Sequence, residues 1–272
     1  MGISTLSGRA LRDGAGERKK IPVQFDKKEF DRKEWPVTQG LPFPQGELAD
    51  LSKLRLLDPD ENEVPLQVRA TSYWSDDSVR WVLLDFCMNA SAGETPSYAV
   101  EYGPGVKRSE VVKPISITEN DDFIEIDNGR LQFRVSKDTF QLLENLVVDG
   151  KKPLEGPAMM TVQDDKGKTY TCSAIKPYSI SVEENGPMRA VISVLGWNAN
   201  KEEEKFLTYT TRIHVYRNQP FVRIFHTLTN RHEEQVTGKH KWARDWPDES
   251  EYRTTELPQQ NIADATILFK PG

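Results

Sequence analysis

The chain has 272 residues, a length that suits one large all-β domain or two domains of ordinary size. Aromatic residues make up 9% of the chain, which excludes wholesale disorder, and a formal net charge of −6 argues against a protein that holds nucleic acid on a basic surface. No apolar run reaches the ~18 residues that a membrane-spanning helix needs.

Residues 1–20 are small, polar and net basic without usable periodicity, so we predict a flexible arm. After this arm, alternating or β-branched runs recur between turn residues, and helical periodicity is scarce. Apolar residues occur at both odd and even positions of residues 79–87, which is typical of a central strand covered on both faces. The pair Asn128-Gly129 predicts a two-residue hairpin turn. The pattern as a whole predicts an all-β chain of the sandwich or barrel type.

The composition of the chain changes over residues 103–115, where Gly103-Pro104-Gly105 ends one block of predicted strands and Val111-Val112-Lys113-Pro114 opens a second. We place a domain boundary in this stretch. The last apolar run, residues 265–269, predicts a strand followed by only three residues. Because an open edge strand is an aggregation liability, we expect this sequence to be a piece of a longer polypeptide.

The chain offers little to a metal or a cofactor. Cys87 and Cys172 form no C-x-x-C pair, and we expect both to be buried thiols. His226 and His232 lie six residues apart, which matches no common metal spacing, and His214 and His240 add none. Glycine-rich nucleotide motifs, a nucleophile elbow and H-E-x-x-H are also missing. We therefore predict no metal site and no cofactor.

Residues 206–216 and 221–229 predict a long hairpin. A turn centred on Asn218-Gln219 gives one side on which the paired residues are polar or aromatic: Tyr216 with Phe221, His214 with Arg223, and Arg212 with Phe225. The pairs on the other side are mostly apolar: Val215 with Val222, Ile213 with Ile224, Thr211 with His226, and Tyr209 with Leu228. The second side belongs in a core, and we predict that His226 is a hydrogen-bonded core histidine.

The first side of this hairpin is suited to an anionic sugar, because arginine supplies charge-assisted hydrogen bonds and aromatic rings supply stacking surfaces. The alternative is that Arg212 and Arg223 only cover aromatic rings on an exposed strand face. The register decides between the sides, since a slip of one residue would move the whole set into the core.

Residues 74–81 form a loop with a tryptophan at each end. We predict that Trp74 and Trp81 pack the first β domain around Pro42-Phe43. The adjacent acids Asp76 and Asp77 fit either a general acid/base pair or the capping of a turn.

Several of these segments carry a family resemblance. Residues 40–46 (GLPFPQG), 64–69 (VPLQVR) and 74–86 (WSDDSVRWVLLDF) resemble the N-terminal β-barrel module of bacterial and fungal exo-acting rhamnogalacturonan lyases. Residues 126–133 (IDNGRLQF), 183–190 (EENGPMRA) and 209–216 (YTTRIHVY) resemble the β-rich region that follows this module. The similarity covers residues 21–272, and Asp77 stands where the family pattern leads us to expect glycine.

The resemblance implies an all-β fold with very little helix: the arm at 1–20, an N-terminal β-barrel at 21–108 and a β-sandwich-like domain at 109–272. It implies the N-terminal β portion of a polysaccharide lyase that acts on pectic rhamnogalacturonan by β-elimination at a uronate. In this family an α/α toroid follows in the same longer chain, so whether the present chain is by itself an enzyme stays open. The alternative is a non-catalytic carbohydrate-binding or scaffolding β module.

β-Elimination next to a uronate needs a cation to neutralise the carboxylate, a base for the α-proton and an acid for the leaving oxygen. We assign Arg212, His214 and Tyr216 as candidate catalytic residues, and Arg223 with Arg212 as candidate substrate-binding residues. The expected partners are an acidic oligo- or polysaccharide and the downstream toroid, and neither nucleic acid nor a membrane is expected. Without a secretory signal we expect a cytoplasmic protein, or a secreted one if a leader precedes this sequence.

Overall fold

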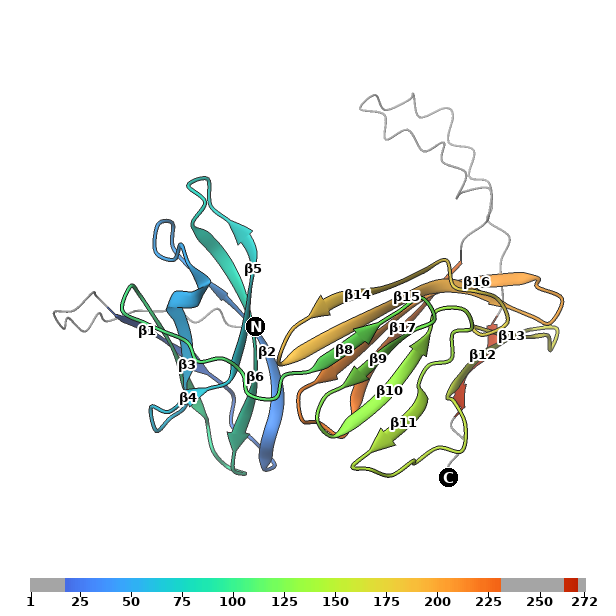
Figure 1. Cartoon of the computed structure of the whole chain (residues 1–272), viewed down its shortest axis with the longest axis horizontal. Coiled ribbons are helices and arrows are strands. Elements are labelled where there is room, and N and C mark those ends of the chain that lie inside the picture. The colour runs from blue at the N-terminus through green and yellow to red at the C-terminus, as the bar shows by residue number, and fades with distance from the viewer. Residues whose placement is uncertain (1–17, 231–261, 269–272) are drawn as a thin grey trace. The chain divides into compact units, whose positions relative to one another are not determined.

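The computed structural model describes residues 18–230 and 262–268, which are almost entirely strands and loops (Figure 1). The one helical segment in this part of the chain is the 3-10 turn η1 (Leu51–Lys53). The predicted all-β fold with very little helix is therefore confirmed. None of the described segments is a helix with the length and apolar character needed to cross a bilayer. Most of the predicted flexible arm, residues 1–17, lies outside the described residues.

Contacts between backbone segments divide the chain into two compact units, with the division between Ile115 and Ser116. Residues 186–189, the turn between two later strands, group with the first unit. The composition change at 103–115 ends at this division. Each unit has its own sheets and its own apolar core.

The first unit is built from two small antiparallel sheets of order β1-β7-β3-β4 and β2-β6-β5. Its strands are β1 (Lys19–Gln24), β2 (Arg32–Pro42), β3 (Leu54–Leu57), β4 (Glu63–Val64), β5 (Leu66–Tyr73), β6 (Val79–Ala90) and β7 (Ser97–Tyr102). One core of buried aliphatic and aromatic side chains serves both sheets. Within it, the rings of Phe86 and Tyr98 lie 5.5 Å apart and those of Phe43 and Tyr102 lie 5.1 Å apart.

Strand β6 is the central strand of its sheet, as its apolar sequence predicts. Its alternation buries Val82, Leu84 and Phe86. Trp81 therefore points to the opposite face, where its ring lies over Gly40 of β2 and is 41% exposed. Trp81 does lie beside Pro42, its register partner, but the expectation that it is a core side chain is wrong, because a strand with apolar residues on both faces gives no indication of which face is covered.

The loop before β6 is a capped turn. The indole Nε1–H of Trp74 donates to the carbonyl oxygen of Phe43 at 2.9 Å, which confirms the predicted packing of this tryptophan. Asp76 Oδ1 accepts hydrogen bonds from the Ser78 hydroxyl at 2.6 Å and the Ser78 amide at 3.1 Å. These bonds, with the hydroxyl first, lower the pKa of Asp76, so the capping interpretation holds. Asp77 has a φ of 62°, in the left-handed region where glycine is most at ease.

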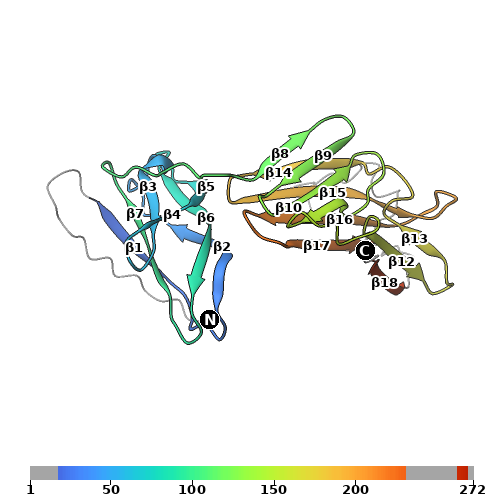
Figure 2. The same cartoon turned by 60° about the horizontal axis from the view of Figure 1, so that its bottom comes forward.

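The second unit is a sandwich of two antiparallel sheets that lie face to face (Figure 2). The smaller sheet has the order β11-β10-β9-β8, and the larger has the order β17-β16-β15-β13-β12-β18, with β14 also paired to β15. The strands of the smaller sheet are β8 (Ser116–Glu119), β9 (Phe123–Asp127), β10 (Leu131–Ser136) and β11 (Glu144–Val148). Those of the larger sheet are β12 (Met159–Asp164), β13 (Thr169–Thr171), β14 (Ser179–Asn185), β15 (Arg189–Ala199), β16 (Lys205–Tyr216), β17 (Val222–Thr229) and β18 (Ile262–Leu268).

Large rings fill the space between these sheets. The ring of Tyr209 on β16 is 1% exposed, stacks on Phe140 at 5.7 Å and donates its hydroxyl hydrogen to the carbonyl oxygen of Cys172 at 3.3 Å. It passes directly over Gly196 of β15, where an added Cβ would lie 2.4 Å from the tyrosine oxygen. Both cysteines are free thiols; Cys172 is buried as predicted, whereas Cys87 is only partly buried.

A single buried side chain joins the two sheets at one end of the sandwich. Asn128, which is 1% exposed, begins the β9–β10 turn, and its Oδ1 accepts from the amides of Arg130 at 3.0 Å and Leu131 at 2.8 Å. Its Nδ2 donates to the carbonyl oxygens of Tyr216 and Gln219 in the β16–β17 turn, both at 2.8 Å. Asp127 pairs with Gln132, so four residues separate the paired positions, where two were predicted.

Candidate functional site

The hairpin of β16 and β17 has the register predicted from the sequence. His214 pairs with Arg223, Arg212 with Phe225 and Thr211 with His226. The side chains of Ile213 and Val215 are buried in the sandwich, and those of Arg212 and Arg223 are exposed on the outer face. We call the outward residues Arg212, His214, Tyr216, Arg223 and Phe225 the β16–β17 face.

Arg212 already has a carboxylate partner on this face. Its Nε and Nη2 donate to the two carboxylate oxygens of Glu183 on β14, at 2.7 and 2.9 Å. This bidentate pair lowers the pKa of Glu183, because both oxygens of the charged form are bound. Sequence reasoning missed Glu183, since the residue lies on another strand 29 positions away. A substrate carboxylate would have to compete with Glu183 for Arg212.

The other members of the face are arranged around two ring contacts. The imidazole of His214 meets the exposed ring of Phe225 edge-on at 5.0 Å. The guanidinium of Arg223 lies 5.9 Å from the ring of Tyr216, so this arginine does cover an aromatic ring. Tyr216 itself is only 6% exposed. Within the described residues Arg223 forms no salt bridge, whereas Arg212 does. The positive charge of Arg223 is therefore available to an anionic ligand.

His226 lies on the inner side of the hairpin and is hydrogen-bonded, as predicted, but it is only partly buried. Its Nδ1 lies 2.8 Å from the hydroxyl of Thr211, and its ring stacks on Tyr209 at 5.8 Å. Burial lowers its pKa from 6.5 to about 4, so the ring is neutral at pH 7. Among the described residues no group of three or more His, Cys, Asp or Glu could hold a metal ion, and His232 and His240 lie outside them.

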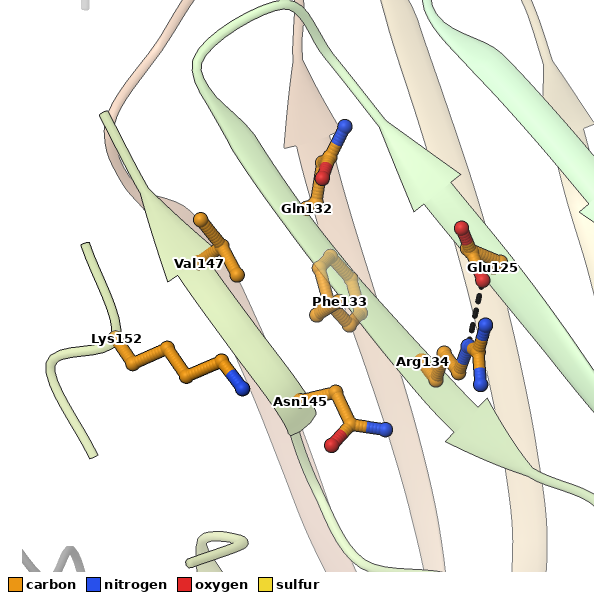
Figure 3. Close-up of a pocket in the computed structure, with 7 residues that line it drawn as sticks. All are labelled: Glu125, Gln132, Phe133, Arg134, Asn145, Val147 and Lys152. Atoms are coloured by element: carbon orange, nitrogen blue, oxygen red, sulfur yellow. Dashed lines mark hydrogen bonds and ion pairs between the residues drawn. The ribbon is translucent and has the colours of Figure 1, made fainter. Parts of the chain in front are cut away.

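Polar side chains also gather on the outer face of the smaller sheet, where two pockets adjoin along β10. The first, of about 320 Å³, has a lining drawn in Figure 3: Glu125, Gln132, Phe133, Arg134, Asn145, Val147 and Lys152. The second, of about 330 Å³, is lined by Asp127, Gly129, Arg130, Gln132, Val147, Asp149 and Gly150. Gln132 and Val147 line both pockets, so the pockets are neighbours on this face, and we call the two together the β10 groove.

Comparison with known families accounts for both units. Residues 20–102 match the PcRGLX-like N-terminal RIFT barrel domain, and residues 115–238 match the PcRGLX-like protein central beta sandwich domain. The chain belongs to the PcRGLX-like family. This confirms the predicted resemblance to the rhamnogalacturonan lyase-like family in this N-terminal region, and it confirms the order of barrel and sandwich.

One curated relative of this PcRGLX-like chain is the uncharacterized protein YetA of Bacillus subtilis (strain 168), with 24% identity over 204 residues. The match covers 70% of the present chain and 23% of YetA. The chain thus spans about a quarter of the relative that it matches.

The PcRGLX-like match covers the elements that carry both surfaces. The β16–β17 face and the β10 groove both lie inside the central sandwich match at 115–238. Sequence reasoning found the face because its residue types alternate along one hairpin. It missed the groove because Gln132, Asn145 and Lys152 lie on different segments and form no motif. The catalytic and binding roles of the face residues stay predictions.

The partly buried imidazole of this PcRGLX-like sandwich makes stability depend on pH. The pKa of His226 is about 4 in the folded state against 6.5 when exposed, so between these values the unfolded chain binds more protons. We expect the free energy of unfolding to fall by up to about 3 kcal/mol from this residue as the pH drops from 7 to 4. Urea titrations across this range should show a flatter profile for His226→Gln than for the wild type.

The matched control is Thr227→Ala, an exposed position on the same strand, which changes no titratable group and should leave the wild-type slope intact. Equal slopes for the wild type and His226→Gln would show that His226 does not make the free energy of unfolding depend on pH.

Proposed function

We propose that this chain is the N-terminal β portion of a polysaccharide lyase that cleaves pectic rhamnogalacturonan by β-elimination at a uronate. The observation that carries the proposal is the consecutive match of both units to domains of the PcRGLX-like family. The substrate itself comes from the sequence resemblance to rhamnogalacturonan lyases. Activity is expected of the longer protein, in which further domains follow the sandwich.

The chemistry of the β16–β17 face supports a role in binding the uronate. Arg223 is an exposed cation beside His214, and a guanidinium binds a carboxylate through two parallel hydrogen bonds. Pairing the carboxylate with a cation lowers the barrier to removing the adjacent proton, because the developing negative charge is stabilised. His214 supplies an imidazole, the side chain that most often serves as a general base or acid in enzymes. In the proposed mechanism Arg223 holds the uronate and His214 transfers the proton.

A second function, sugar binding without catalysis, is favoured by one contact and one buried side chain on the same face. Arg212 is held by Glu183, and Tyr216 is nearly buried, so two of the three predicted catalytic groups are engaged in the fold. In this alternative the face binds acidic sugar through Arg223, and other domains of the longer protein perform the elimination.

The test uses the longer protein with pectic rhamnogalacturonan and follows the ultraviolet absorbance of the unsaturated product. We expect Arg223→Ala to lower kcat/KM by about ten- to a hundred-fold, the loss of one charge-assisted interaction of about 1.5–3 kcal/mol. Lys205→Ala, which removes an exposed cation from the same hairpin, should stay near the wild-type value. Binding of the polymer without absorbance would support the non-catalytic alternative, and absence of both would refute the proposed function.

A further inference from the structure

We infer that the β10 groove is a second carbohydrate-binding site, which holds two consecutive sugar residues, one of them a uronate. The site lies on the smaller sheet of the sandwich, and nothing in the proposed lyase chemistry uses it. The charges and shape of the groove indicate an acidic oligosaccharide. The further statement that this sugar is pectic rests on the proposed function.

The shape of the groove fits a short oligosaccharide. Each pocket, of about 320 or 330 Å³, exceeds the volume of a single sugar ring, and the two meet at Gln132 and Val147. Gln132 presents an amide at the junction, with its Nε2 bound to Asp127 at 2.5 Å. Val147 adds an aliphatic side chain against which the apolar face of a sugar packs.

The first pocket is the cationic end. Figure 3 shows Lys152 extending toward Asn145, with the Glu125–Arg134 pair on the other side of the hollow. Arg134 Nε donates to Glu125 at 2.5 Å, and its guanidinium lies 4.2 Å from the ring of Phe123. Within the described residues, the terminal nitrogens of Arg134, the ammonium of Lys152 and the amide of Asn145 have no protein hydrogen-bond partner. Of the charged side chains that line this pocket two are cations and one is a carboxylate, a balance that suits a uronate. Glu144, the register partner of Arg134, lies nearby but does not line the pocket.

Asn145 is held in this pocket by an irregular backbone. The register of β10 with β11 shifts between Gln132 and Arg134, and Asn145 has a φ of 52°, in the left-handed region. A bulge of this kind redirects a side chain from the regular pleat, and such features concentrate at binding sites. The bulge thus places the exposed Asn145 amide on the pocket wall, where it is available to a sugar hydroxyl.

The second pocket is the acidic end. Arg130 is bound by both carboxylate oxygens of Asp149, at 2.7 and 2.6 Å, so its charge is neutralised. Asp127 adds a further carboxylate, which leaves this pocket with a net negative charge. Carboxylates accept hydrogen bonds from sugar hydroxyls and repel a second uronate. The groove therefore favours an alternating ligand, with a uronate at Lys152 and a neutral sugar at Asp127.

The experiment titrates the present chain calorimetrically with a disaccharide of galacturonate and rhamnose, and with its uncharged methyl ester. We expect Lys152→Glu to weaken binding of the acid at least about ten-fold and to change binding of the ester about two-fold or less. Lys201→Glu is the matched control, because it makes the same change of charge at an exposed lysine of the same sandwich that lines neither pocket. It should bind the acid as the wild type does. Both lysines are exposed, and unchanged melting temperatures verify that the variants fold.

Arg223→Ala in the same titration separates this site from the β16–β17 face. Binding that survives Arg223→Ala and is lost in Lys152→Glu establishes the groove, even if the longer protein then gives no unsaturated product. Failure of the wild type to bind, equal affinities of Lys152→Glu and wild type, or equal weakening by Lys201→Glu and Lys152→Glu would each overturn the inference. None of these three results bears on lyase activity of the longer protein.

Discussion

Replacing Asn128 by Asp is expected to lower the free energy of unfolding by about 3–5 kcal/mol, the range for a buried charge left without its partner. The amide nitrogen of Asn128 donates to the carbonyl oxygens of Tyr216 and Gln219. An aspartate at this position has the same shape but places a carboxylate against those two oxygens in a site that is 1% exposed. The variant therefore tests the join between the two sheets without opening a cavity.

Chemical denaturation measures this loss, and Asn120→Asp provides the matched control. Asn120 also caps a turn, since its Oδ1 accepts from the amides of Asp122 and Phe123, both at 2.9 Å, but it lies on the surface. An aspartate keeps that acceptor role, so we expect a change below about 1 kcal/mol. A similar small change for Asn128→Asp would mean that the two carbonyl oxygens are not held by this side chain.

Gly196→Ala is expected to destabilise the sandwich by about 3 kcal/mol, at the upper end of the usual cost of overpacking a core. The new methyl group would lie 2.4 Å from the oxygen and 2.6 Å from the adjacent ring carbon of Tyr209. The ring has no room to move, because it stacks on Phe140 and is 1% exposed. Gly156→Ala, at a position with no heavy atom near an added Cβ, should change stability by less than about 0.5 kcal/mol.

A double-mutant cycle with Tyr209→Leu identifies the cause of the Gly196→Ala effect. The smaller side chain removes the clash, so Gly196→Ala should cost clearly less in the Tyr209→Leu background than in the wild type. Equal costs in the two backgrounds would place the strain in the backbone of β15 instead of the ring.

The sequence predicts correctly the features that depend on the two-residue alternation of a strand. The register of β16 with β17 follows from a period of two and one turn, and it places Arg212, His214 and Arg223 on the outer face as expected. The same reasoning fails at Trp81, because β6 is apolar on both parities and alternation alone does not show which face is covered. Local pattern thus determines pairing within a hairpin but not the environment of its faces.

The features that sequence reasoning missed depend on strands that are distant along the chain. Asn128 appears in the sequence as a turn residue, and nothing local shows that its amide reaches the β16–β17 turn some 90 positions later. Glu183 reaches Arg212 across the intervening strand β15. The β10 groove depends on a bulge at Asn145 that no turn signal announces. In each case the contact joins residues on segments that are distant in the sequence, and the pattern of one segment does not predict it.

The strand that completes the larger sheet has consequences for how the sandwich assembles. β18 (Ile262–Leu268) pairs antiparallel with β12 (Met159–Asp164), about a hundred positions earlier, whereas the family match ends at residue 238. Pairing between strands so far apart in the sequence raises the contact order of this edge, so we expect it to form late in folding. A protein shortened at residue 238 would retain the family match yet expose the free backbone amides and carbonyls of β12. Such an edge recruits strands from neighbouring molecules, and the shortened sandwich would be prone to aggregate.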